Sequence, residues 1–365
     1  MEKKKVITTL VIIMLFLAVA SFFFLFGKHI LPTKWHSSLK STDKNKSEEA
    51  SLANIRALHE KIANFPKVRL SRKEYEEYKA TFSSLVKKEN PTVALQQLAR
   101  LRTEGKISID CHNLTHEIGR AAYEKYQDSV AAFRYKMQVC GFGYVHGVIE
   151  SYVENTADAI GTMQTLCQRY PVRLDELECY HAIGHSLMIY YGNDVPLAIN
   201  ICDQYSDDTA KSACGLGVFM ENFSSDEDHP SEFVSPDDPF YPCQEQKDVY
   251  KPNCYKMAPF YYLKLHDDDY RDILSWCATE SVHLSGWCTR GVILQIAQYN
   301  VGIKILEQFC FSGAKEQAFP CIHEVVRNQI LYHPKSVPDI CKKFEYPLGQ
   351  EYCKKAMPLD DGPSI

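Results

Sequence analysis

The sequence predicts an all-α protein, namely an α-solenoid of helix-pair repeats stapled by disulfides behind one N-terminal transmembrane helix. The first observation is the spacing of the 14 cysteines. From Cys167 onward they form six pairs whose members lie 11 or 12 residues apart, and successive pairs begin 31 to 41 residues apart. The second observation is that apolar residues recur at helical spacing in two segments between these pairs. Two helices per unit and a period of roughly 20–50 residues are typical of a solenoid.

The third observation is an uncharged segment near the N-terminus, which predicts the transmembrane helix. Lysines occupy positions 3 to 5, and the segment runs from Val6 to Gly27. As a helix it is about 33 Å long, enough to cross the hydrocarbon core of a bilayer. Positive charge in front of it favours a cytosolic N-terminus and an exported C-terminus. The alternative is a signal peptide cleaved after residues 18–20. The apolar run continues past that site to Phe26, which favours an uncleaved signal-anchor.

Five parts follow one another along the chain: a membrane anchor at 1–28, a flexible linker at 29–50, a helical capping region at 51–110, cysteine-rich helical repeats at 111–357 and a tail at 358–365. The linker is rich in polar residues, as flexible tethers are. In the capping region, three segments (51–64, 72–88 and 91–104) have the apolar spacing of helices and are expected to cover the first repeat. The chain has a net charge of −5 although its N-terminus is basic. The exported part is therefore acidic, which argues against nucleic-acid binding.

One unit illustrates the repeat. The segment CYHAIGHSLMIYYGNDVPLAINIC begins at Cys179 and ends at Cys202. Its first helix is about 12 residues long by apolar spacing, and Asn193-Asp194 before Pro196 supplies the chemistry of a second helix start. The first cysteine of a pair therefore closes one unit and the second opens the next. A disulfide across a loop of about 10 residues would stabilise this corner by roughly 2–3 kcal/mol.

The cysteines are expected to form disulfides rather than free thiols or zinc sites. The chain is exported, the number of cysteines is even, and no CxxC pair occurs, whereas structural zinc uses closely spaced pairs. Cys111 and Cys140 have no cysteine 11 or 12 residues upstream. We expect them to pair with each other, which requires the starts of two neighbouring helices to converge. Otherwise two thiols lie beside the most histidine-rich part of the chain.

Histidines in the first three repeats are the best candidates for chemistry. Each of these repeats carries two ligand-type side chains four residues apart, which places both on one helix face. A helix with two ligands beside a helix with one or two more is how helical metal sites are built. The predicted ligands of a zinc, iron or copper ion are His112, His116, His146, Glu150, His181 and His185.

The preferred ligand set is His116, His146 and Glu150, completed by His112 or His185. Adjacent helices lie about 10 Å apart, so the first and third are close to about 20 Å apart unless the array curves strongly. Four glycines nearby would let helices or a ligand approach closely: Gly119, Gly143, Gly147 and Gly184. The alternative is a set of buried histidines bonded to tyrosines and backbone, because no established motif such as HExxH is present.

The repeat units resemble those of cysteine-rich Sel1/TPR-like proteins. The residues that carry the resemblance are units of the type Gly184…Tyr191-Gly192…Pro196-Leu197-Ala198 and the paired cysteines over 111–353. The likeness is one of architecture. It implies a scaffold that displays a concave surface for a protein or peptide partner.

Two functions are therefore in competition. The first is a membrane-tethered, extracytoplasmic helical-repeat protein that binds a partner and carries a metal site in its first repeats. The alternative is a metal-dependent enzyme whose active site is formed by the helices of 111–190, with Glu117 or Glu150 as general base on metal-bound water. Outside this region, the pair His323-Glu324 is interpreted as an isolated surface pair.

Overall fold

The structure, a computed structural model, describes residues 54–357 except 66, 226–229, 298, 300 and 333. The described residues form one compact unit. Every regular element of its described part is helical, as the sequence predicts. After a first helix at residues 54–63, the α-helices are α3 (Arg72–Lys88), α4 (Pro91–Thr103), α5 (Cys111–Tyr126), α6 (Ser129–Phe133), α7 (Gly143–Glu154), α8 (Ala159–Leu166), α9 (Arg173–Tyr190), α10 (Val195–Cys202), α11 (Asp208–Ser224), α12 (Lys251–Leu265), α13 (Ile273–Cys277), α14 (Val282–Ala297), α15 (Ile303–Cys310), α16 (Lys315–Tyr332) and α17 (Pro347–Ala356).

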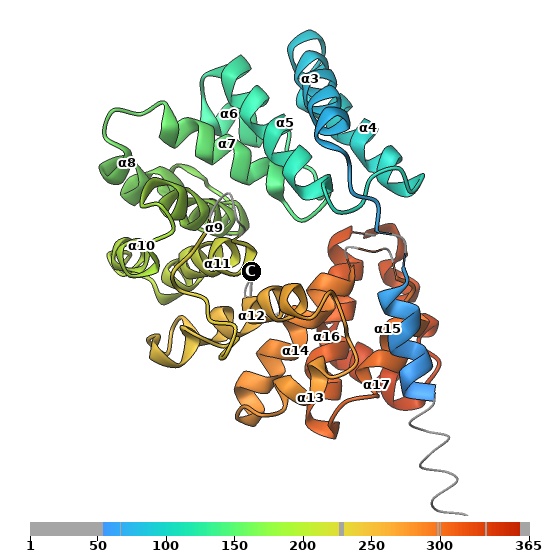
Figure 1. The fold of residues 1–365 in the computed structure, drawn as a ribbon. Coiled ribbons are helices and arrows are strands. Elements are labelled where there is room, and N and C mark those ends of the chain that lie inside the picture. Colours follow the sequence, from blue (N-terminus) through green and yellow to red (C-terminus); the bar gives the residue numbers. More distant parts are fainter. Residues whose placement is uncertain are drawn as a thin grey trace, which may run out of the picture. The chain divides into compact units, whose positions relative to one another are not determined.

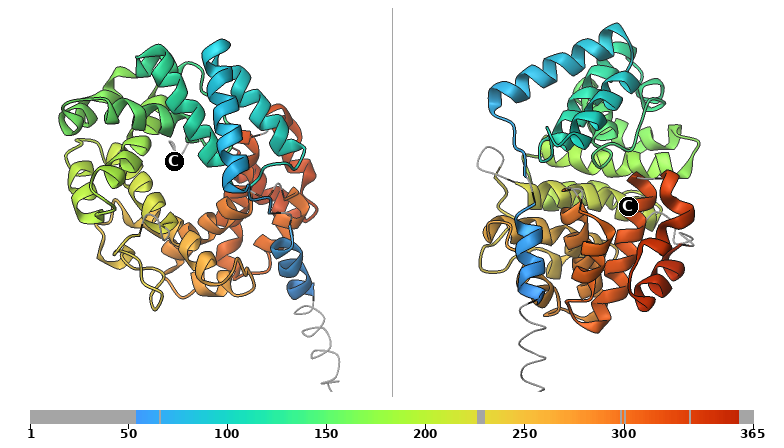
Figure 2. Two further views of the ribbon diagram at one scale, coloured as in Figure 1. Left: turned by 45° about the horizontal axis from the view of Figure 1, so that its top comes forward. Right: turned by 90° about the vertical axis from the view of Figure 1, so that its right-hand side faces the viewer.

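Long helices form the inner layer of a curved row, and short helices form its outer layer (Figure 1). The inner layer consists of α5, α7, α9, α11, α12, α14 and α16, and each of these helices packs on the next. The row bends round on itself (Figure 2), so that helices far apart in the sequence present their inner faces to one interior space. This bend decides which side chains meet.

Disulfides join the successive helix pairs. All 14 cysteines are paired, and the partners are those that the sequence predicts, including Cys111 with Cys140, whose Cα atoms lie 5.7 Å apart. The second cysteine of a pair does not open its helix, however. α9 begins at Arg173, with Asp175 and Glu176 in its first turn, and Cys179 lies well inside it. Acidic residues in a first turn favour an earlier helix start, because they interact well with the helix dipole. Seven disulfides indicate an oxidising compartment outside the cytosol.

The first helix packs against the end of the repeat array instead of its beginning. Nε2 of His59 lies 3.3 Å from Oγ of Ser312, and its ring centroid lies 5.3 Å from that of Phe309 in α15. Just after this helix, Lys67 forms a salt bridge of 2.8 Å with Asp268. α3 and α4 instead pack on α5, at the start of the repeats. The beginning and the end of the array are thus tied together.

The predicted transmembrane segment, Val6–Gly27, and the predicted linker lie outside the described residues. Among the helices that the structure describes, we find none with both the length and the apolar character that a bilayer crossing requires.

Candidate metal centre

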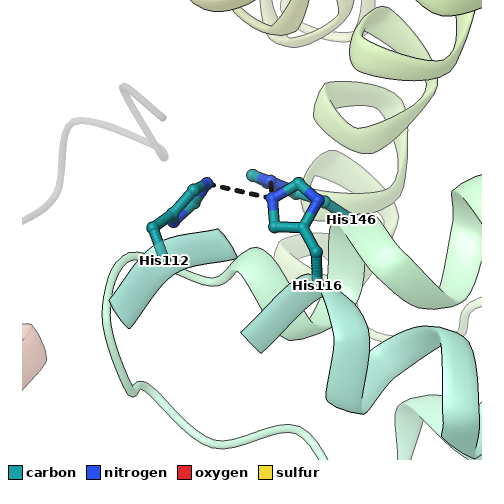
Figure 3. Close-up of side chains that lie close together, drawn as sticks. All are labelled: His112, His116 and His146. Carbon is teal, nitrogen blue, oxygen red and sulfur yellow. Dashed lines mark hydrogen bonds between the residues drawn. The ribbon is translucent and has the colours of Figure 1, made fainter. Parts of the chain in front are cut away.

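Five imidazole rings from three successive inner helices meet at the interior. α5 carries His112 and His116, α7 carries His146, and α9 carries His181 and His185. Among neighbouring rings of this group, the centroid distances range from 4.2 Å between His146 and His185 to 6.2 Å between His116 and His185. Figure 3 shows three of the rings, those of His112, His116 and His146, turned toward one another. The structure therefore brings together all five histidines that the sequence singled out. We call them the histidine cluster.

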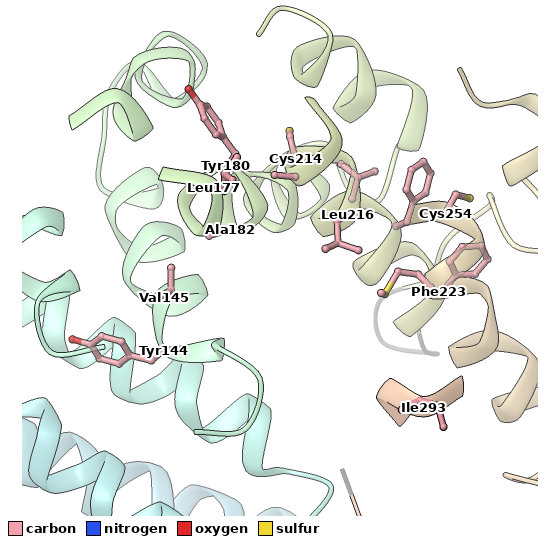
Figure 4. Packing of buried hydrophobic residues seen from close by; sticks show 14 of the residues in the cluster. Tyr144, Val145, Leu177, Tyr180, Ala182, Cys214, Leu216, Phe223, Cys254 and Ile293 are labelled. Atoms are coloured by element: carbon pink, nitrogen blue, oxygen red, sulfur yellow. The ribbon is translucent and has the colours of Figure 1, made fainter. Parts of the chain in front are cut away.

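Glycines at the helix contacts allow this approach. A Cβ atom on Gly147 of α7 would lie 1.9 Å from the carbonyl oxygen of His116, and one on Gly119 of α5 would lie 2.1 Å from that of Tyr144. Gly184 of α9 meets α11 in the same way. Buried apolar side chains hold these helices on their other faces (Figure 4). Tight packing and the bend of the row thus meet the condition of strong curvature that ligation by three helices requires.

The first three histidines of the cluster, His112, His116 and His146, could hold a metal ion. Nδ1 of His112 lies 2.7 Å from the carbonyl oxygen of Cys140, and Nδ1 of His116 lies 3.1 Å from Oε1 of Glu150. Both oxygens only accept hydrogen bonds, so both Nδ1 atoms carry a hydrogen. In a neutral imidazole the opposite Nε2 then has a free lone pair. These two Nε2 atoms lie 3.1 Å apart, so a metal ion or a proton must separate them.

His146 also belongs to a second triad, with His181 and His185. Nδ1 of His185 lies 2.5 Å from Oε1 of Glu221, which fixes its hydrogen on that side. Nε2 of His185 therefore points its lone pair at Nε2 of His181, 3.1 Å away. Nδ1 of His181 is buried and has no hydrogen-bond partner in the described part of the chain. The second triad thus has the same close Nε2–Nε2 pair as the first, but an acceptor holds Nδ1 of only one of its two rings.

The distances between ring nitrogens suit a transition metal. Two nitrogens bound tetrahedrally to one ion at about 2.0–2.1 Å lie about 3.3 Å apart. Nε2 of His116 lies 3.1 Å from Nε2 of His112 and 3.3 Å from Nδ1 of His146. Histidines that bind metals usually donate their other N–H to a carboxylate or carbonyl, which orients the ring. The spacing of these nitrogens therefore fits a metal ion, and the Nδ1 hydrogen bonds of His112 and His116 turn Nε2 of each ring toward it.

Burial and neighbouring charges set the protonation of the cluster. Burial lowers the pKa of His112 to about 3 and holds that of His146 well below its ordinary value, and nearby histidine charges act in the same direction. Burial also opposes the charging of His116, but the Glu150 carboxylate outweighs it, and the pKa of His116 is raised. Burial alone would raise the pKa of Glu150, yet the charges of His116 and Arg120 lower it to about 2. Mostly neutral imidazoles beside an ionised carboxylate are ready to bind a metal ion.

A cavity of about 740 Å³ lies beside the histidine cluster, and all five histidines line it. Apolar side chains of α11, α12 and α14 form another part of its wall, and Lys256 of α12 and Arg327 of α16 also line it. A concave site with an apolar wall and a few convergent polar groups is typical of small-molecule binding.

The two acids expected to act as general bases lie in different places. Oε2 of Glu117 forms a 3.1 Å salt bridge with Lys79, and Glu117 is not among the described residues that line the cavity. Glu150 contacts His116 and also accepts from Nη2 of Arg120 at 2.9 Å. Glu150 therefore holds His116 in position through Nδ1. The preferred ligand set had instead included Glu150 as a direct ligand.

Three charged residues at the site were missed by sequence reasoning, namely Arg120, Glu178 and Glu221. Oε1 of Glu178 is buried without a hydrogen-bond partner among the described residues, and this residue lines the cavity. Burial raises the pKa of Glu178 although Lys136 opposes the shift. The position of Glu221 in the repeat is a signal that could have identified it. Each supporting carboxylate comes from the inner helix that follows the histidine, as Glu150 follows His116.

The interpretation of His323-Glu324 as a surface pair was wrong. The two residues are 6% and 0% exposed. Oε1 of Glu324 lies 3.7 Å from Nζ of Lys256 and 3.3 Å from Nη1 of Arg327. The bend of the row turns this face of α16 inward, and its charge partner comes from α12, which local sequence cannot reveal.

The chain matches no family model, and neither the curated proteins nor the solved structures contain a significant match to it. The resemblance to Sel1/TPR-like repeats therefore stands only at the level of paired helices with regularly placed disulfides.

Proposed function

We propose that this protein is a metal-dependent enzyme, tethered to a membrane on the exported side, that binds one transition metal ion in the histidine cluster and a small molecule in the adjoining cavity. The observation that supports this most directly is the 3.1 Å separation of the Nε2 atoms of His112 and His116, whose Nδ1 atoms both donate to oxygens. A metal ion between them would use both nitrogen lone pairs, whereas a scaffold without metal would need a proton in the same place.

The donor set favours zinc or copper over iron. The nearest possible ligands are the nitrogens of five imidazole rings. The carboxylates of Glu150 and Glu221 accept hydrogen bonds from Nδ1 atoms of His116 and His185. Non-haem iron more often combines two imidazoles with a direct carboxylate ligand. A bound ion would supply Lewis-acid or redox chemistry at the cavity wall.

The test is metal analysis of the full-length protein, purified in detergent and reloaded separately with zinc, copper and iron. We expect one tightly bound ion per chain. His116→Gln and His185→Gln should lower metal affinity strongly, because each removes a ring nitrogen from one triad. His283→Gln, at an exposed histidine of α14, is the matched control and should behave like the unchanged protein.

The competing function, a helical scaffold for a protein or peptide partner, predicts the opposite result. In that case imidazole–imidazole hydrogen bonds fill the interior, with His116 protonated between His112 and Glu150. The purified protein would then hold no stoichiometric metal after reloading, and the His116→Gln variant would bind metals no more weakly than His283→Gln. That outcome would refute the metal-dependent enzyme.

The membrane tether rests on the uncharged segment Val6–Gly27 and the lysines before it. We expect the full-length protein to remain in the membrane fraction after an alkaline carbonate wash and to leave it only with detergent. Release by carbonate alone would contradict an uncleaved anchor.

A further inference from the structure

The part of the cavity wall formed by α12 and α16 carries a second polar site. Lys256 and Arg327 both line the cavity. The side chain of Lys256 is only 2% exposed, and that of Arg327 is 17% exposed. A buried ammonium group lowers stability unless negative charge or hydrogen-bond acceptors surround it. The partners of this lysine therefore decide whether it serves structure or binding.

The carboxylate beside these cations does not form a short hydrogen bond with either of them. Glu324 lies 3.7 Å from Nζ of Lys256 and 3.3 Å from Nη1 of Arg327. Charge-assisted hydrogen bonds are shorter, about 2.7–2.9 Å. Two cations thus share one carboxylate at long range. Burial lowers the pKa of Lys256 to about 8, so the ammonium form still predominates at neutral pH. Lys256 and Arg327 together therefore carry one more positive charge than Glu324 beside them.

An apolar stretch of wall belongs to the same cavity. It consists of side chains from the helices between α9 and α16, and its members are Leu216, Met220, Met257, Phe260 and Leu294. The histidine cluster on α5, α7 and α9 stands at one end of this series of helices, and α16 stands at the other. The two polar sites are within electrostatic range, since the charge of Lys256 is one of those that, after burial, depress the pKa of His181.

We infer that Lys256 and Arg327 bind the anionic group, a carboxylate or a phosphate, of a small ligand whose apolar body lies against this stretch of wall and whose other end faces the histidine cluster. An ammonium and a planar guanidinium that line the same cavity can give an oxyanion strong, directed hydrogen bonds. That the ligand is a substrate rests on the proposed function. The anion site itself rests on α12 and α16 alone.

The test measures the binding of small probes to the full-length, metal-free protein by isothermal titration calorimetry. The probes are phenylacetate, phenyl phosphate and the neutral 2-phenylethanol, which is close to phenylacetate in size. Metal-free protein is used so that a carboxylate cannot be held by the metal. We expect an anionic probe to bind at one site per chain and about 10- to 100-fold more tightly than the alcohol. The stronger of the two anions identifies the class of headgroup.

Variants then assign the site. Lys256→Met and Arg327→Gln should each remove most of the preference for the anion. Lys251→Met, at the first residue of α12 and not among the described residues that line the cavity, should retain it. Because Lys256→Met leaves Glu324 with a weaker partner, the double variant Lys256→Met/Glu324→Gln keeps the local net charge without an uncompensated carboxylate. It should fold and still lose the preference.

Two results would overturn the inference. One is equal binding of the anions and the alcohol, or no binding of either anion at millimolar concentration. The other is unchanged affinity for phenylacetate in a folded double variant, which would make Lys256 only the structural partner of Glu324. Neither result affects the metal analysis, so failure of the anion site and failure of the metal centre are distinguishable.

Discussion

The contact between α5 and α7 gives a quantitative test of the metal centre, through the substitution Gly147→Ala. The added Cβ would lie 1.9 Å from the carbonyl oxygen of His116. Carbon and oxygen atoms of neighbouring helices approach to about 3.3 Å at best, so the helices must separate by about 1.4 Å. The distance between Nε2 of His116 and Nδ1 of His146, now 3.3 Å, would widen toward about 4.7 Å.

This displacement exceeds what a shared ion tolerates. Two nitrogens bound at about 2.1 Å can be no more than about 4.2 Å apart, even on opposite sides of the metal. We therefore expect Gly147→Ala to weaken metal binding by at least about 100-fold, more than the loss of a supporting hydrogen bond would. Overpacking should also lower the free energy of unfolding by about 1–3 kcal/mol. Both quantities are measurable, by competition titration against a metal chelator and by urea unfolding.

Gly302→Ala is the matched control, because a Cβ at that position meets no atom within 4 Å. It should leave both metal affinity and stability unchanged. If Gly147→Ala folds and binds metal as tightly as Gly302→Ala, the close approach of α5 and α7 is not what assembles the ligands, and the shared site of His116 and His146 is refuted.

Three further predictions concern the surroundings of the cluster. Replacing Cys111 and Cys140 by serine opens a crosslink with a sequence separation of 29, and should lower the free energy of unfolding in urea by about 3.6 kcal/mol; no change would contradict the role of this staple. Glu221→Gln should weaken metal binding about 10- to 100-fold in the chelator titration by loosening His185, and an unchanged affinity would show that this carboxylate does not orient the ring. Between pH 8 and 10 the unfolded chain holds the proton of Lys256 and the folded chain releases it, because the folded pKa is about 8. The stability of the natural protein should therefore rise with pH relative to Lys256→Met, and a falling difference would refute the lowered pKa.

Much of the scaffold could be predicted from the sequence because its signals are local. Helix periodicity and cysteine spacing each depend on residues near one another in the chain. They predicted the paired helices and, together with the even count, the disulfides. The proposed pairing of Cys111 with Cys140 followed by elimination, and the structure bears it out. The helices begin earlier than the cysteine spacing predicts, because acidic residues ahead of Cys179 favour a start of α9 at Arg173.

The candidate site was only partly accessible to the same reasoning. Histidines four residues apart on a helix point the same way, so the members of the cluster could be named in advance. Among their supporting groups, Glu150 was expected as a ligand instead, and Glu221 was missed because it reaches His185 from another helix. The buried Glu324 was assigned to the surface for the same reason, since Lys256 comes from a different repeat.

By itself, the sequence determined the repeating helical unit, the pairing of the cysteines and the residues able to bind a metal, because short stretches of chain encode each of them. Only the tertiary structure decided that the row of helices bends enough to bring α9 to α5. It also decided that the first helix packs on the last repeats and that one cavity has histidines at one end and cations at the other. Curvature is the sum of small angles at every helix contact, set by glycines and side-chain packing between residues far apart in the chain. No short segment of the sequence therefore determines the curvature of the whole row.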